Sequence, residues 1–106
     1  MSEQNTLIKF GHKFQTKVIS SLLGDKVFLQ TICDILEPEY FDSDSNKWIS
    51  QTIRDYFFEY KTAPTLEVMK VKIDELENEI LQVAVVNDLK ESWRLIQSTD
   101  LKFVQE

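Results

Sequence analysis

Apolar residues at intervals of three and four recur along most of the 106-residue chain, and this spacing constrains its fold more than any other feature. Because an α-helix has about 3.6 residues per turn, the spacing places apolar side chains on one helical face. No stretch alternates apolar and polar residues as a half-buried β-strand does. Two glycines and two prolines are all that interrupt the pattern. We therefore predict an all-α protein, a small helical bundle of five to six helices.

Short polar or proline-containing breaks separate the predicted helices. The expected helices span about residues 11–23, about 25–36, from the polar cluster 42–46 to about Tyr60, about 66–76 and about 79–97. Gly24 supplies a left-handed stop for the first helix. Pro38 requires the second helix to end before it, because proline disfavours helical geometry in the preceding residue. Side-chain oxygens cap the third helix from within the polar cluster, and Thr65 is placed to cap the fourth.

The C-terminal residues predict one more helix. Ser98 or Thr99 is placed to cap a helix that begins at Asp100. Its apolar residues Leu101, Phe103 and Val104 stand close to the last residue of the sequence. We therefore expect the chain to end within a helix rather than after one.

The apolar faces of these helices predict the core. The third helix has the heaviest aromatic load, and we expect it to be central. Its predicted face is Ile49, Ile53, Tyr56, Phe57 and Tyr60, with Trp48 on the flank. The other predicted faces are Phe14, Val18 and Leu22; Phe28, Ile32, Ile35 and Leu36; Leu66, Met69, Ile73 and Leu76; and Ile80, Val83, Val86, Leu89, Trp93 and Ile96.

Charge argues against direct binding to duplex DNA. The formal net charge is −6, and residues 1–30 carry +2, so the remaining 76 residues carry −8. Because DNA-binding proteins gain most of their affinity by neutralising phosphates, an acidic body repels the duplex. A stand-alone helical DNA-binding module, with residues 65–76 as its recognition helix, remains an alternative, although that helix has a charge of −1. A protein-adaptor module is a further alternative.

Candidate chemical groups are few. The isolated Gly11 and Gly24 do not form a phosphate-binding loop, and His12 has no nucleophile or carboxylate at a suggestive spacing. Cys33 suits a small buried hydrophobic residue. Residues 42–53 begin like an EF-hand calcium loop but lack its glycine and its final glutamate. We therefore predict no catalytic, cofactor-binding or metal-binding residues.

Three aromatic residues outside the main apolar stripes are candidates for binding a partner. Tyr40 and Phe41 follow Pro38 in a predicted turn, and Trp48 lies on the flank of the third helix. Most aromatic residues of a small domain belong to its core. Aromatic residues are also enriched at protein–protein interfaces, so the alternative is that Tyr40, Phe41 and Trp48 contribute to a partner-binding patch.

The order of several short segments resembles the N-terminal domain of DnaB-type replicative DNA helicases, and especially the hexameric helicases of T4-like phages. The apolar helix pair from Val18 to Leu29 is followed by Ile35-Leu36-Glu37-Pro38-Glu39-Tyr40-Phe41, which looks like that family's turn ending in Tyr-Phe. Phe58-Glu59-Tyr60 with Pro64-Thr65 beyond it comes next, and Trp93 then leads into Asp100-Leu101-Lys102-Phe103-Val104. The resemblance covers about residues 14–106.

The resemblance implies a helical domain that helps to assemble a hexameric ring and docks primase. It assigns residues 14–106 to this domain and leaves residues 1–13 as a basic, partly disordered N-terminal extension. ATP, magnesium and DNA would be bound by a RecA-like domain further along a parent helicase, so this part would not itself be an enzyme. The same resemblance implies a location in the cytoplasm of an infected bacterial host. No apolar run approaches the roughly 20 residues of a membrane span, so we expect no membrane binding.

Overall fold

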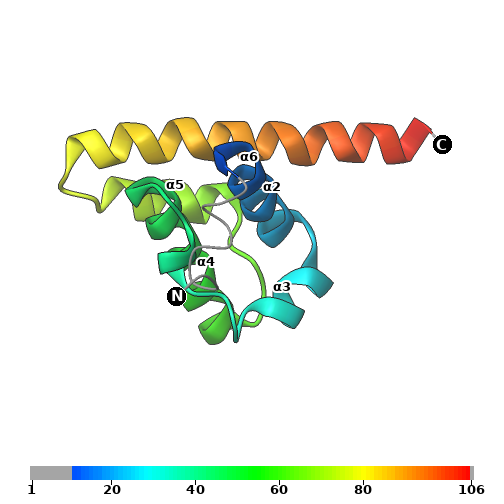
Figure 1. The fold of residues 1–106 in the computed structure, drawn as a ribbon, viewed down its shortest axis with the longest axis horizontal. Helices are drawn as coiled ribbons and strands as arrows, with labels where there is room; N and C mark the ends of the chain where they lie inside the picture. Colours follow the sequence, from blue (N-terminus) through cyan, green and yellow to red (C-terminus); the bar gives the residue numbers. More distant parts are fainter. Residues whose placement is uncertain (1–10, 106) are drawn as a thin grey trace.

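The computed structural model describes the backbone of residues 11–105 and the side chains of residues 11–96 (Figure 1). In chain order, the described elements are α2 (Gly11–Gly24), α3 (Lys26–Ile32), the 3₁₀ helix η2 (Pro38–Tyr40), α4 (Asp44–Tyr60), α5 (Leu66–Asp74) and α6 (Glu79–Gln105). These residues contain five α-helices and no strand. The predicted all-α bundle is therefore confirmed.

The longest helix, α6, organises the bundle. It runs along one side of the molecule, and α2, α4 and α5 each pack against it (Figure 1). α3 packs on α2, and η2 packs on α4. The C-terminal part of α6 extends past the other helices (Figure 1). The core consequently lies beneath the middle of α6, where α2 and α4 meet it.

The buried apolar residues come from every α-helix and from the loop around η2. They are Ile19, Leu22, Leu29, Cys33, Leu36, Phe41, Ile49, Ile53, Met69, Ile73, Val85 and Leu89. Ile49 and Ile53 are fully buried, as the predicted central position of α4 requires. Phe28 and Phe57 are half-buried and pack against this core, so they form its edge.

Side-chain caps explain where four of the helices begin. Asp25 caps α3, Ser43 caps α4 and Thr65 caps α5, each by accepting a hydrogen bond from the backbone N–H three residues later. Asn78 accepts one from Leu81 at the start of α6, with an N···O distance of 3.0 Å. The predicted Thr65 cap is confirmed, and Ser43 is the cap within the polar cluster.

Two predicted boundaries and one predicted backbone conformation are wrong. α3 ends at Ile32 rather than near residue 36, because the chain then turns through hydrogen bonds from Ile35 and Leu36 to the Ile32 carbonyl. α6 continues through Ser98 and Thr99, since these residues disfavour a helix interior only weakly. Gly24 ends α2 without a left-handed conformation: Gly11 is the described glycine with positive φ. The predicted extension 1–13 stays a prediction, because residues 1–10 lie outside the described residues.

The buried face of several helices differs from the predicted apolar stripe. Phe14, Tyr60, Leu66, Ile80 and Val83 are exposed, and so is Ile35 after α3. Small or polar residues are buried instead: Gln15, Thr16, Ser45, Asn46, Ser50 and Ser92. Hydrogen bonds from the Thr16 and Ser50 hydroxyls to carbonyls of their own helices satisfy these groups. Thr16 and Ser50 can therefore be buried at helix contacts, which an apolar count does not anticipate.

Candidate partner-binding groove

A shallow groove lies between α4 and α5 and has a volume of about 310 Å³. We call it the α4–α5 groove. Its lining residues are Trp48, Thr52, Asp55, Tyr56, Glu59 and Tyr60 from α4, and Lys72, Glu75 and Leu76 from α5 and its end. The α4 residues recur at helical spacing and therefore share one face of that helix. Both helices pack on α6, which sets the distance between them.

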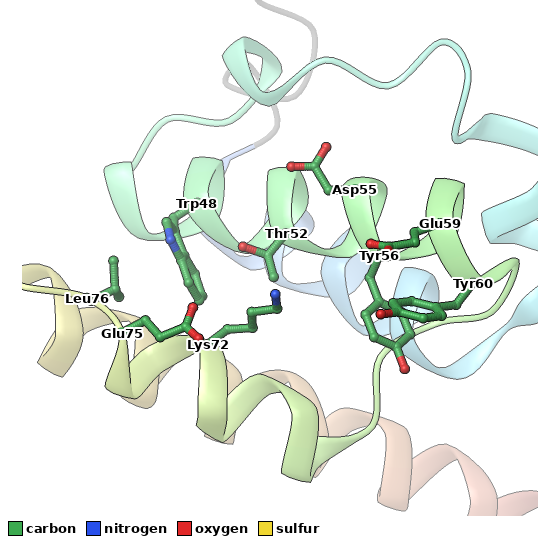
Figure 2. A pocket seen from close by; sticks show the side chains of 9 residues that line it. All are labelled: Trp48, Thr52, Asp55, Tyr56, Glu59, Tyr60, Lys72, Glu75 and Leu76. Carbon is green, nitrogen blue, oxygen red and sulfur yellow. The ribbon is translucent and has the colours of Figure 1, made fainter.

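Aromatic side chains form much of the α4 wall. Figure 2 shows Trp48 reaching from α4 toward α5, where it approaches Glu75. At the other end, the Tyr56 and Tyr60 rings are in contact in a tilted arrangement, with their centroids 4.5 Å apart and an angle of 40° between their planes. Lys72 extends from α5 toward α4 between these two aromatic ends (Figure 2). The groove thus presents three aromatic rings together with one ammonium group and three carboxylates.

The charged groups of the groove do not converge on one point. Asp55 points away from α5 in Figure 2, and its carboxylate accepts a hydrogen bond of 2.8 Å from Gln51 on the same helix. Glu75 lies beside Trp48 at the opposite end from Glu59. Rings with spread charges suit contacts with a protein surface, where aromatic anchors provide apolar area and charges at the edge provide specificity.

Of the three aromatic residues predicted to bind a partner, the structure places only Trp48 in this groove. Tyr40 is half-buried and packs against the core from η2. Phe41 is fully buried, so the prediction of a partner-binding role for its side chain is corrected to a core role. Sequence reasoning missed Lys72 and Glu75, because no periodicity indicates which faces of two separate helices meet.

The turn that contains Tyr40 and Phe41 is fixed from two sides. Phe41 fills the core, and its backbone N–H donates to the Pro38 carbonyl at 3.1 Å. The buried Gln15 side chain of α2 accepts a hydrogen bond of 2.9 Å from the Asp42 N–H. An arginine of α4, Arg54, lies 3.5 Å from the Glu37 carboxylate at the start of the turn. The Pro38–Phe41 segment therefore joins α2 to α4.

The segment that begins like an EF-hand loop is a helix start. Ser43 caps α4, and Asn46 is buried within its first turn. In the part of the chain whose side chains are described, no three His, Cys, Asp or Glu side chains cluster so as to hold a metal ion. Helix capping, the interpretation preferred from the sequence, accounts for Ser43, whereas Ser45 Oγ and Asn46 Nδ2 are buried without a hydrogen-bond partner among the described residues.

His12 and Cys33 lie apart from the groove. The His12 imidazole is exposed and lies 3.6 Å from the Asp88 carboxylate, which joins the first turn of α2 to α6. The Cys33 thiol is buried in the core, as predicted, and this burial raises its pKa despite the nearby Arg54. A thiol held in its protonated form is a poor nucleophile, so Cys33 serves packing.

Comparison of this chain with family models, curated proteins and solved structures finds no match. Within the described residues, no helix combines the length and the apolar character that crossing a membrane requires.

Proposed function

We propose that this chain is a non-catalytic assembly and docking domain, the N-terminal domain of a phage replicative helicase of the DnaB type, and that it docks primase. A hexamer of the parent chain would carry six such domains, with ATP, magnesium and DNA bound by the RecA-like domain of that chain. The proposal rests on the ordered set of segments in residues 14–106 that resemble this family.

The observation that carries the proposal is that residues of three resembling segments hold core or capping positions in one bundle, although Phe58 and Tyr60 of a fourth segment are exposed. Phe41 of the Tyr-Phe turn is a core residue, and Thr65 after Pro64 caps α5. Trp93 packs against the core from α6. Segments that fix a fold in this way are the ones that related domains share, so their order supports a common architecture with the helicase domains.

Within this proposal, the α4–α5 groove is the docking site for primase. Trp48 and Tyr56 supply the apolar area, and Lys72 and Glu75 lie where they can pair with charges of a partner. Exposed charges at an interface edge contribute chiefly to association rate and specificity, whereas buried aromatic anchors contribute most of the binding energy.

Binding to the primase of the same replication system tests the docking role. We expect Glu75→Lys to weaken binding by about tenfold, measured by isothermal titration calorimetry. Glu67→Lys is the matched control, because Glu67 is exposed on α5, changes the charge equally and does not line the groove. Absence of binding by the unchanged chain, or equal loss in both variants, would remove the groove from the proposal.

The helicase assignment has its own test. The reading frame that contains these 106 codons should continue into a phosphate-binding loop of the form G-x-x-x-x-G-K-[ST], within a domain that hydrolyses ATP. A stop codon directly after Glu106 would contradict the assignment while leaving the docking experiment interpretable.

A protein-adaptor module is the second candidate function, because the groove alone, without the family resemblance, favours it. A stand-alone DNA-binding module is less well supported. On α5, the exposed Lys70 and Lys72 are accompanied by Glu67, Asp74 and Glu75, so a phosphate backbone would meet mixed charge. A gel shift with random duplex at low salt, if it shows tight binding, would favour the DNA-binding alternative.

A further inference from the structure

A second and larger groove lies between α5 and α6, with a volume of about 630 Å³. We call it the α5–α6 groove. Its walls are apolar, and they consist of Leu66 and Ile73 from α5 and Val86, Leu89 and Trp93 from α6. It shares no lining residue with the α4–α5 groove. It is therefore a separate site on the same bundle.

The apolar surface continues along α6 beyond this groove. A neighbouring hollow of about 350 Å³ shares Ile73, Asp74 and Val86 with it and adds Val83, whose exposed fraction is 61%. From Val83 to Arg94 the surface follows α6 for roughly 16 Å, at about 1.5 Å per residue. This length matches about three turns of a helix lying along the groove.

Basic side chains surround the apolar walls. Lys70 of α5 and Lys90 and Arg94 of α6 line the groove, and Asp74 is the single acidic residue among its lining residues. Arg94 also pairs with Glu91 of its own helix, so Lys70 and Lys90 provide the cations that have no partner among the described ion pairs. The chain has a net charge of −6, but this groove is lined by three basic residues and one acidic residue. We call these three basic residues the basic rim, and they make the groove locally positive.

We propose that the α5–α6 groove binds an amphipathic α-helix of a partner protein whose apolar face is flanked by aspartate or glutamate. Burial of the partner's apolar face against Leu66, Val86 and Trp93 supplies the affinity. Carboxylates on either side of that face reach Lys70 and Lys90. A helix with a basic flank is rejected by the same two lysines, which provides selectivity.

The proposal does not depend on the helicase assignment, since the groove and its charges belong to this chain alone. A second copy of the chain is the competing occupant. Such a copy would have to bring an acidic amphipathic face into the groove, and it would do so without any added peptide. Oligomeric state measured alone therefore distinguishes self-association from binding of a different protein.

The experiment titrates the full chain with a fluorescent peptide of about 16 residues that has leucine and phenylalanine at helical spacing and glutamate at the flanking positions. The matched peptide has lysine in place of each glutamate. We expect the glutamate peptide to bind at least about tenfold more tightly, and to shift backbone NMR resonances of α5 and the 83–94 part of α6. Its affinity should fall as salt rises, because the rim charges are exposed.

Variants locate the site. Lys70→Glu and Lys90→Glu should each weaken binding of the glutamate peptide by about fivefold to tenfold, and Leu66→Gln should weaken binding of both peptides. Lys26→Glu on α3 is the control, an equal charge change at an exposed residue outside the groove, and it should leave the affinity within about twofold. Circular dichroism verifies that each variant is folded.

Three results would overturn the proposal. Equal affinity for the glutamate and lysine peptides would remove the role of the basic rim. Resonance shifts confined to α4 would place the peptide in the other groove. A dimer that forms without peptide, and that Leu66→Gln dissociates, would identify a second copy of this chain as the occupant.

Discussion

Two faces of α6 near its start carry similar aliphatic residues in opposite surroundings. Val85 and Leu89 are buried among the apolar residues of the bundle, in what we call the central core. Ile80 and Val83 of α6 are exposed, as are Val71 and Leu66 of the short helix α5, and we call these four exposed residues the α5 margin. One face of the helix is thus covered by the bundle, whereas the other face at the same level along the helix is exposed. Apolar residues at helical spacing define a face, and the number of neighbouring helices decides whether that face is buried.

Truncation in the central core should have the largest effect. Ile53 of α4 is fully buried, so Ile53→Ala should lower the free energy of unfolding by about 2–5 kcal/mol through lost apolar contact and the cavity left behind. Val71→Ala in the α5 margin removes methyl groups from a side chain that is 58% exposed, and it should change stability by less than about 0.5 kcal/mol. Urea denaturation followed by circular dichroism measures both. Equal losses would abolish the distinction between the two regions.

The contact between Gly24 at the end of α2 and Ile96 of α6 tests how tightly these two helices are packed. A Cβ atom on Gly24 would lie 3.3 Å from two carbons of Ile96, closer than an ordinary contact. Gly24→Val should therefore destabilise the fold by about 1–3 kcal/mol by overpacking. The double variant with Ile96→Ala should recover part of this loss, a non-additivity that thermal melting would reveal. If the double variant loses the sum of the two single effects, the close contact is not the cause.

Removal of the cap of α5, the helix that contributes Leu66 and Val71 to the α5 margin, should have a smaller and more local effect. Thr65→Ala removes the hydroxyl that accepts a hydrogen bond from the Val68 N–H, and it should cost about 1 kcal/mol. If the margin opens more readily than the central core, amide hydrogen exchange should accelerate in α5 while the amides of α2 and α4 keep their protection. Ser43→Ala, which removes the cap of α4, is the matched comparison. Uniform acceleration in every helix after Thr65→Ala would show that the bundle opens as one unit.

The sequence predicts the helices of this fold well because capping and periodicity are local properties. Thr65 as the cap of α5 and Ile49 with Ile53 as buried residues of α4 follow from neighbouring residues alone. The exposure of Ile80 depends on how α5 lies beside α6, which no local pattern contains. The burial of Gln15 has the same origin, because its hydrogen bond reaches Asp42 in a distant loop. For the candidate groove, Trp48 could be predicted from its own helix, whereas Lys72 and Glu75 come from another.

The smallest expected effect concerns the first turn of α6. Ile80 is 85% exposed, so Ile80→Gln transfers little apolar area from protein to water, and glutamine favours a helix at least as well as isoleucine does. The free energy of unfolding should stay within about 0.5 kcal/mol of the original, measured by urea denaturation at a protein concentration low enough to keep the chain monomeric. Because Ile80 does not line the α5–α6 groove, affinity for the glutamate-flanked peptide should also stay within about twofold. A loss of more than about 1 kcal/mol would show that the start of α6 is covered in solution, and the α5 margin would then have to be redrawn without Ile80.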